Sequence, residues 1–355
     1  MQIIRSKAPA RIDLAGGTLD LWPLYLFFNN ATTINCAIDQ FAEVRIEVSQ
    51  ESKVEEVSRI ELQSEDRNEK ASFRSYGELL ESFQNSHKTE HLPPSLWLHA
   101  RVLRHFFSFW RRSAPLKIST KCAAPAGAGL GGSSALNIAL CSSLLKLTQA
   151  PYTEEELIPL ARDLETTVID VPAGIQDYWP ALHGGIQAIR MEPGRVSRKV
   201  FNNRAEFLES HLVLCYSGQS RNSGINNWSV YKKFIDGDAT VKKSFSEIAE
   251  ATFLVEEALE RQSFEIFAKG IQKEWFARQQ LAPTIATVEM LQVMQRAQEL
   301  GSATAKVCGA GGGGCFILIV PSEKKQTIQT HLRKDGIHVL DFNIVEHGCV
   351  VMDVQ

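Results

Sequence analysis

The sequence contains no long apolar segment of the kind that crosses a membrane. Two long uncharged stretches, Leu21–Ile38 and Cys122–Leu145, are interrupted, the first by Pro23 and the second by Pro125 and a run of glycines. A membrane-spanning helix needs about 20 consecutive apolar residues. The N-terminal segment also lacks the apolar core of a signal peptide. We therefore expect a cytoplasmic protein that has no membrane partner.

The sequence also lacks an excess of one charge and any clustering of cysteines. Its 38 Lys and Arg residues against 41 Asp and Glu residues give a net charge of −3, which provides no general attraction to nucleic acid. Its seven cysteines are scattered and never spaced C-x-x-C, so neither a disulfide framework nor a zinc knuckle is indicated. We expect free thiols, a reducing compartment and no nucleic-acid partner.

What the sequence does have is an alternation of strand-like and helix-like segments along 355 residues, a length that suits about two domains. The segment 192–207 is rich in turn residues and poor in core residues, so we place a boundary near residue 195, between domains 1–195 and 196–355. The alternation in both halves indicates an α+β or α/β fold.

Local patterns predict several individual elements. Helical patterns follow one another at about 240–262, 263–282 and 284–300. Thr153, followed by three glutamates, is typical of a helix start, and this helix should run to about Glu165. The segment 343–354 is predicted to be the final strand.

A glycine-rich segment, Pro125–Ala135, stands between a predicted strand and a predicted helix. Glycines let the backbone curl so that successive N–H groups point into one concavity, and the positive end of the following helix also attracts phosphate. A tight turn with a serine N-cap is the alternative. Four glycines in six positions exceed what a turn needs, so we predict a phosphate-binding loop formed by Pro125, Gly127, Gly129, Leu130, Gly131, Gly132, Ser133 and Ser134.

The pattern of this loop narrows the choice of phosphate ligand. The P-loop pattern G-x-x-x-x-G-K-[ST] requires a lysine directly after the glycines, and this loop has none there. The dinucleotide pattern G-x-G-x-x-G is present at Gly127, Gly129 and Gly132, but no acidic residue stands between Cys122 and Thr153 to hold a ribose. A dinucleotide-dependent oxidoreductase is therefore disfavoured.

Two further glycine turns accompany the loop, AGGTLD at 15–20, which follows Pro9-Ala10-Arg11, and GAGGGG at 309–314. The order and spacing of the three motifs resemble those of the GHMP kinase superfamily. Three other segments are similar to its branch of D-glycero-D-manno-heptose 7-phosphate kinases and L-fucokinases, namely 32–39, 164–185 and 215–224. The first motif departs from that branch, which more often has Gly-Gly-Gly-Thr-Asp where this chain has Gly-Gly-Thr-Leu-Asp.

The resemblance implies an α+β fold with an N-terminal ribosomal-protein-like βαβ domain and a ferredoxin-like C-terminal domain, with the nucleotide between them. It implies ATP and Mg²⁺ as cofactors. It also implies a small-molecule sugar or sugar-phosphate substrate that is phosphorylated at its anomeric hydroxyl. A mevalonate-pathway kinase and a non-catalytic ligand-binding relative are the alternatives, and the sequence leaves a homodimer open.

The resemblance also assigns roles to particular residues. Asp177 matches the catalytic carboxylate that accepts the proton of the attacking hydroxyl, and Arg11 matches the basic residue that contacts it. Glu165, together with a hydroxyl of Ser133 or Ser134, matches the Mg²⁺ site, because Mg²⁺ prefers oxygen ligands.

The resemblance further implies that the following residues contact the substrate: Gly17, Asp20, Asp39, Arg221, Gly311 and Gly312. The carboxylate of Asp20 would accept hydrogen bonds from sugar hydroxyls, and Arg221 would pair with a substrate phosphate. The structural alternative is that Asp13 and Asp20 only stabilise their turns.

Overall fold

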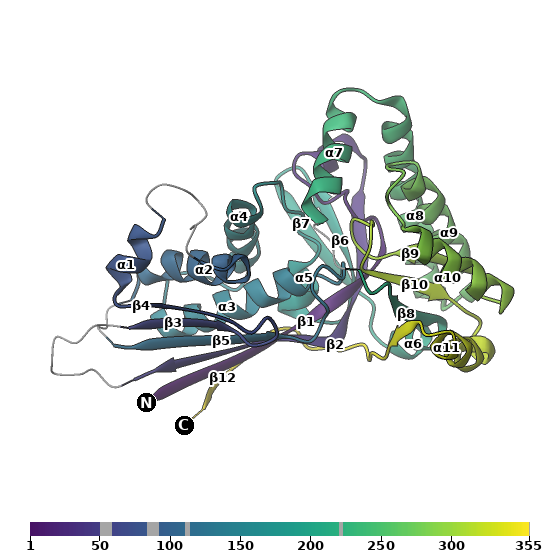
Figure 1. Cartoon of the computed structure of the whole chain (residues 1–355). Coiled ribbons are helices and arrows are strands. Elements are labelled where there is room, and N and C mark those ends of the chain that lie inside the picture. Colours follow the sequence, from purple (N-terminus) through teal and green to yellow (C-terminus); the bar gives the residue numbers. More distant parts are fainter. Residues whose placement is uncertain (50–58, 84–91, 111–113, 220–222, 355) are drawn as a thin grey trace.

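The computed structural model describes residues 1–49, 59–83, 92–110, 114–219 and 223–354 (Figure 1). Its strands are β1 (Gln2–Ala15), β2 (Ala31–Val48), β3 (Ile60–Ser64), β4 (Glu69–Phe73), β5 (Leu116–Cys122), β6 (Ile186–Glu192), β7 (Arg195–Val200), β8 (Leu212–Tyr216), β9 (Thr304–Val307), β10 (Cys315–Ile319), β11 (His338–Leu340) and β12 (Val350–Val354). Its α-helices are α1 (Tyr76–Glu81), α2 (Trp97–Phe107), α3 (Gly132–Thr148), α4 (Leu157–Ile169), α5 (Tyr178–His183), α6 (Ala205–His211), α7 (Ser223–Ile235), α8 (Ala239–Arg261), α9 (Phe264–Gln279), α10 (Val288–Glu299) and α11 (Lys325–Lys334).

The strands form two sheets. The larger sheet has the order β12-β1-β2-β5-β3-β4, and the hairpin β6–β7 joins it through β2. The smaller sheet is antiparallel and has the order β11-β8-β10-β9. Figure 1 shows α1–α4 on one side of the larger sheet and α8–α10 beside the smaller one. This mixed architecture confirms the predicted α+β fold class.

The long antiparallel hairpin β1–β2 positions the candidate site. Ile12 and Leu14 of β1 are fully buried in a core that also contains residues of β8, β10, α8 and α9. Because successive side chains of a strand point to opposite faces, Arg11 and Asp13 point away from that core. Both are nonetheless buried, with Arg11 3% exposed and Asp13 fully enclosed. The strand thus delivers two charged side chains, two residues apart, to one enclosed place.

Most predicted elements are present, but two differ in extent. The helix expected from Thr153 to Glu165 is α4, which begins at Leu157 and ends at Ile169. The side chain of Glu156 accepts hydrogen bonds from the amide and the hydroxyl of Thr153, and this pairing holds a turn ahead of the helix. The strand expected over 343–354 is confined to β12, because the chain first crosses the end of α5, where the Cys349 amide donates to Leu182 O at 3.1 Å.

The division of the chain near residue 195 stays a prediction. The position lies at the turn of the β6–β7 hairpin, whose two strands pair with each other. Residues from the far end of the chain also return to the larger sheet, because β12 pairs antiparallel with β1.

The structure bears on two further expectations, one about the cysteines and one about membrane-spanning helices. The seven cysteines are free thiols. Along the described ranges, none of the helices combines the length and the apolar character needed to cross a lipid bilayer.

Candidate active site

The predicted phosphate-binding loop leads directly into α3. Gly131 is the N-cap of this 17-residue helix and has a left-handed φ of 70°. Glycine adopts that conformation without the steric penalty of a side chain. The loop therefore faces the positive end of a long helix, which favours an anionic group there.

The second and third glycine turns pack backbone against backbone. A Cβ atom on Gly129 would lie 2.5 Å from Cys308 O, and one on Gly314 would lie 2.7 Å from Ala128 O. The Cys315 amide donates a hydrogen bond to Ala128 O at 2.7 Å. The glycines thus permit a close approach between turns that are about 180 residues apart in the sequence.

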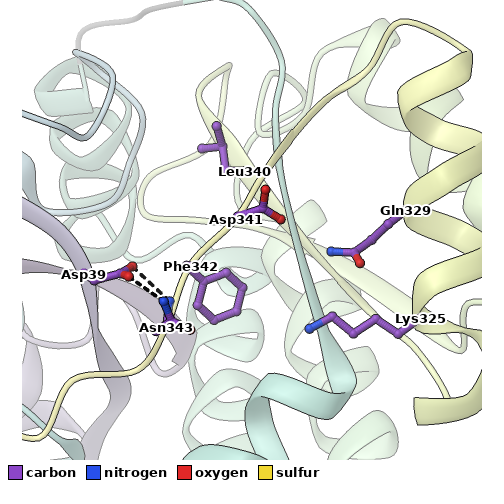
Figure 2. A pocket seen from close by; sticks show the side chains of 7 residues that line it. All are labelled: Asp39, Lys325, Gln329, Leu340, Asp341, Phe342 and Asn343. Carbon is purple, nitrogen blue, oxygen red and sulfur yellow. Dashed lines mark hydrogen bonds between the residues drawn. The ribbon is translucent and has the colours of Figure 1, made fainter.

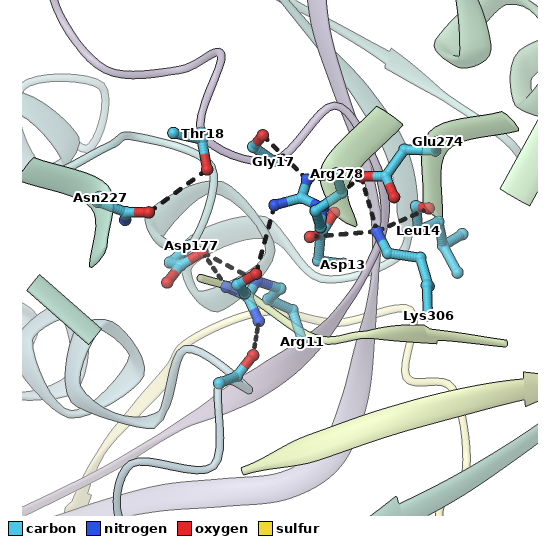
Figure 3. Close-up of polar contacts among 12 residues, drawn as sticks. Arg11, Asp13, Leu14, Gly17, Thr18, Asp177, Asn227, Glu274, Arg278 and Lys306 are labelled. Atoms are coloured by element: carbon cyan, nitrogen blue, oxygen red, sulfur yellow. Dashed lines mark hydrogen bonds and ion pairs between the residues drawn. The ribbon is translucent and has the colours of Figure 1, made fainter. Parts of the chain in front are cut away.

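The structure brings Arg11 and Asp177 together, as the resemblance implied (Figure 3). Arg11 Nε donates to Asp177 Oδ1 at 2.8 Å, and Arg11 Nη2 lies 2.6 Å from the same oxygen. Arg11 also donates from Nη1 to Gly129 O and from its amide to Leu130 O. Burial alone would lower the pKa of Arg11, but the charges of Asp177 and Asp13 outweigh it and raise that pKa.

Asp177 lies beside the phosphate-binding loop. A Cβ atom on Gly131 would be 3.3 Å from its carboxylate. The Asp177 side chain keeps 25% of its surface exposed, whereas the Arg11 side chain keeps 3%. One carboxylate therefore has solvent access, a fixed cationic partner and the N-terminal end of α3 next to it.

Asp20 is brought to the same place but is enclosed. Its side chain is 2% exposed, and its Oδ2 accepts a hydrogen bond from the Gln176 amide at 2.9 Å. Gly174 permits this approach, because a Cβ atom there would lie 1.9 Å from Asp20 Oδ2. Burial, reinforced by the charges of Asp177 and Asp13, raises the pKa of Asp20 to about 6, against the partial opposition of the Gln176 hydrogen bond.

Glu165 meets both serines of the loop. Ser133 Oγ donates to its Oε1 at 2.7 Å, Ser134 Oγ donates to its Oε2 at 3.2 Å, and Tyr178 Oη donates to Oε2 at 2.6 Å. Burial raises the pKa of the Glu165 carboxyl above its ordinary value, although the hydroxyl donors partly oppose this. Tyr178 is a participant that the sequence analysis did not identify.

The predicted metal ligands fit Mg²⁺ only in part. In the portion of the chain that the structure describes, no three His, Cys, Asp or Glu side chains are grouped to hold a metal ion. Glu165 and a serine hydroxyl would provide two oxygen ligands. Mg²⁺ commonly takes one or two protein oxygens and completes its shell with phosphate oxygens and water, so this donor set suits it when a nucleotide is present.

Asp39, a predicted substrate contact, lines a pocket other than this site. Both carboxylate oxygens of Asp39 accept hydrogen bonds from Asn343, at 2.9 and 2.7 Å. Figure 2 shows Asp39 at a separate pocket of about 270 Å³, which α11 and the segment 340–343 also line. The sequence around Asp39 does not indicate that Asn343 is its partner. Arg221 lies outside the described residues.

The glycines assigned to substrate have structural neighbours instead. A Cβ atom on Gly17 would be 2.6 Å from Asp13 Oδ2 and 3.0 Å from Arg278 Nη2. A Cβ atom on Gly311 would be 2.1 Å from Ile285 O, and the Gly312 amide donates to that same oxygen at 2.7 Å. Their small size is thus explained by packing, and their contact with substrate stays a prediction.

A buried charged cluster beside the site was missed by the sequence analysis. It consists of Asp13, Glu274, Arg278 and Lys306, and each of these side chains is 0% or 1% exposed. Asp13 had been considered only as a turn residue. A signal was present: Lys306 stands in the apolar strand just before the third glycine turn, and Glu274 and Arg278 are spaced i,i+4 in a helix with apolar neighbours.

Two family models match the chain. The GHMP kinases N terminal domain matches residues 98–185, and the GHMP kinases C terminal domain matches residues 255–338. The first match contains the phosphate-binding loop, Glu165 and Asp177. The second contains Glu274, Arg278, Lys306 and the third glycine turn.

Individual proteins are similar over two thirds to nearly all of the chain. D-glycero-alpha-D-manno-heptose 7-phosphate kinase of Campylobacter jejuni is 24% identical, with 98% of each chain covered. Mevalonate kinase of Pyrococcus furiosus is also 24% identical, but over 69% of this chain and 71% of its own. The crystal structure of a D-glycero-D-manno-heptose 1-phosphate kinase from Bacteroides thetaiotaomicron superimposes with a TM-score of 0.76 at 21% identity, covering 99% of each chain.

Proposed function

We propose that this chain, which belongs to the GHMP kinases, transfers the γ-phosphoryl group of ATP to a hydroxyl of a sugar or sugar phosphate. One observation carries the proposal: the Arg11–Asp177 pair lies directly against the glycine loop at the N-terminus of α3. A proton acceptor and a phosphate-binding element are therefore adjacent, as phosphoryl transfer to a hydroxyl requires. The likeness to sugar kinases over nearly the whole chain supports the same reaction.

In this proposal Asp177 accepts the proton of the attacking hydroxyl. Its exposed face can reach a bound acceptor, and the bonds from Arg11 fix the orientation of the carboxylate. Arg11 remains charged throughout, so it also stabilises negative charge that develops on the transferred group. The amides of the loop and the start of α3 bind the phosphates of the nucleotide.

Mg²⁺ would be held by Glu165 and by a hydroxyl of Ser133 or Ser134, with nucleotide phosphates completing its shell. When bound, it supplies positive charge against the phosphate oxygens. Three hydroxyls donate to Glu165 and keep its carboxylate at the loop, so Tyr178 and one serine would still hold it if the other serine bound the metal.

The acceptor is proposed to be a hexose or heptose, free or phosphorylated, that receives phosphate at the anomeric carbon. Support comes from Asp20. Its carboxylate accepts a hydrogen bond from the amide of Gln176, the residue directly before Asp177. A carboxylate at the acceptor pocket accepts hydrogen bonds from sugar hydroxyls but repels a substrate that is itself a carboxylate, such as mevalonate. Several mevalonate kinases are nevertheless similar to this chain over about two thirds of it, so mevalonate is the second candidate.

A panel of acceptors with coupled detection of ADP tests the proposal. The panel should hold hexoses, heptoses, their phosphates, L-fucose, mevalonate and phosphomevalonate, each with ATP and Mg²⁺. We expect turnover of at least one sugar, with kcat/KM for mevalonate lower by about 100-fold or more, since one misplaced charge costs about 3 kcal/mol in an enclosed pocket. Efficient turnover of mevalonate with none of any sugar would contradict the acceptor assignment, and no turnover of any acceptor would contradict the kinase assignment.

A further inference from the structure

The buried cluster of Asp13, Glu274, Arg278 and Lys306 joins three parts of the chain that are far apart in sequence. Asp13 comes from β1, Lys306 from β9, and Glu274 and Arg278 from α9. Lys306 Nζ lies 3.3 Å from Asp13 Oδ2 and 3.2 Å from Glu274 Oε1. Arg278 Nε donates to Glu274 Oε1 at 2.8 Å. Two positive and two negative charges are thus enclosed with no net charge.

Stability alone does not account for such a cluster. Enclosing charges has a large desolvation cost, and apolar residues of the same volume are often as stable or more stable. Burial by itself would raise the pKa of Asp13, but the charges of Lys306, Arg278 and Arg11 outweigh it and hold that pKa below its ordinary value. The cluster therefore offers Arg278 and Lys306 as fixed hydrogen-bond donors, which an apolar core lacks.

Those donors reach the backbone of two glycine turns (Figure 3). Arg278 Nη2 donates to Gly17 O in the first turn at 3.0 Å, and Arg278 Nη1 donates to Gly309 O in the third turn at 3.5 Å. Lys306 Nζ donates to Leu14 O, just before the first turn, at 3.1 Å. One guanidinium thus bridges the turn that precedes Asp20 and the turn that follows β9.

The third turn contacts the carbonyl to which Arg11 donates a hydrogen bond. A Cβ atom on Gly309 would lie 3.2 Å from Gly129 O, and Gly129 O is the carbonyl that accepts a hydrogen bond from Arg11. An unbroken series of contacts therefore runs from Arg278 through Gly309 and Gly129 to Arg11 and Asp177. None of the cluster side chains is exposed enough to touch a substrate.

We propose that Arg278 and Lys306 are positioning residues that hold the first and third glycine turns at the spacing that aligns the acceptor hydroxyl with the transferred phosphate. This inference rests on the proposed function for its kinetic consequence. The structural consequence, that both turns depend on one guanidinium, is independent of the substrate. Arg278 has the larger role because a planar guanidinium can serve Glu274 and both carbonyls at once, whereas an ammonium at the same place cannot.

The decisive variant is Arg278→Lys, which keeps the charge that balances Glu274. We expect a melting temperature within about 3 °C of the wild type, a kcat at least about tenfold lower, and amide hydrogen exchange at least about tenfold faster in both 16–19 and 309–313. A residue that only stabilises the fold would lower the melting temperature and leave the kcat of the folded fraction unchanged. Lys273→Met is the matched control, because Lys273 lies on the same helix but pairs with Glu250 at the surface, and it should change none of the three readouts.

Two outcomes would overturn the inference. One is Arg278→Lys with wild-type kcat and wild-type exchange in both turns. The other applies if Arg278→Lys does not fold: Glu274→Gln then weakens the hold on Arg278 at nearly unchanged volume, and wild-type exchange in both turns of this variant contradicts the inference. If the wild type phosphorylates no acceptor, the proposed function fails, while the exchange measurements still decide whether Arg278 holds the two turns.

Discussion

Arg11 and Asp13 stand two residues apart on β1 and each forms an ion pair, but the two pairs are built differently. Asp177, the partner of Arg11, has a side chain that is 25% exposed. Asp13 and its partner Lys306 are both fully enclosed. A group that exchanges a proton with a substrate needs access, whereas a group that fixes a backbone needs only unchanging partners. The same face of the strand therefore carries an accessible pair, which we propose to react, and an enclosed pair, which we propose to support the backbone, and exposure distinguishes the two.

The largest effect is expected from breaking the enclosed pair. Lys306→Met leaves Asp13 and Glu274 without their shared ammonium, so the free energy of unfolding should fall by roughly 3 to 5 kcal/mol. Chemical denaturation followed by circular dichroism measures the loss. Lys146→Met, which removes a half-exposed surface pair with Asp353, is the control and should change stability by less than about 1 kcal/mol. Equal stability of the two variants would contradict the distinction between the enclosed ion pair and the surface ion pair.

Breaking the exposed pair should affect catalysis and spare the fold. Asp177→Asn keeps the shape of the side chain but cannot accept a proton, so turnover should fall by about 100-fold or more while ATP still binds. Initial rates with the best acceptor and a calorimetric titration with ATP measure the two quantities. Turnover within about threefold of the wild type would rule out Asp177 as the base.

An effect of intermediate size is expected from Asp20, which should make the free energy of unfolding depend on pH. Its folded pKa of about 6 exceeds the ordinary value of 3.8, so between these values the folded chain holds a proton that the unfolded chain has lost. The contribution of Asp20 to the free energy of unfolding therefore decreases as pH rises through this window, by about 2 to 3 kcal/mol in total.

Asp20→Asn removes this dependence. Relative to the wild type, the variant should gain about 2 kcal/mol between pH 4 and pH 7, measured by denaturation at both values. The gain is a difference between two pH values, so any constant effect of the substitution cancels. A parallel pH profile for the two proteins would show that the carboxylate is not enclosed in solution.

The smallest effect is expected at the predicted metal ligands. Glu165→Gln, and Ser133→Ala with Ser134→Ala, should raise the Mg²⁺ concentration needed for half-maximal activity by about tenfold, equivalent to about 1.4 kcal/mol. Activity titrations with Mg²⁺ measure this shift, and unchanged circular dichroism shows that the fold is retained. Wild-type titration curves in both variants would remove Glu165 and the serines from the Mg²⁺ site.

Much of the site could be predicted because its residues lie within short motifs. The glycine spacing of 125–135 identified the loop, and the matches at Arg11, Glu165 and Asp177 identified groups that the fold does bring to it. Asp39 shows the limit of such matching: its neighbours in sequence fit a substrate role, but Asn343, about 300 residues later, occupies both of its oxygens. No local pattern contains that partner.

The buried cluster was unpredictable for a related reason. Asp13, Glu274 and Lys306 each look like an ordinary charged residue in its own segment, and only the packing of β1, β9 and α9 makes them partners. The early end expected for α4 had a different cause. Its C-terminal residues carry no stop signal before Asp170, so the helix continues to Ile169.

The pairing of β12 with β1 has a consequence for how the protein is made. The outer edge of β1, Ile3–Lys7, pairs with Val350–Val354, a segment that is translated long after it. Until β12 has been translated, the strand that carries Arg11 and Asp13 presents unpaired backbone groups along this edge, where another chain can pair with it. Arg5 and Lys7 on that edge carry like charges. These charges discourage pairing with another chain until β12 is available.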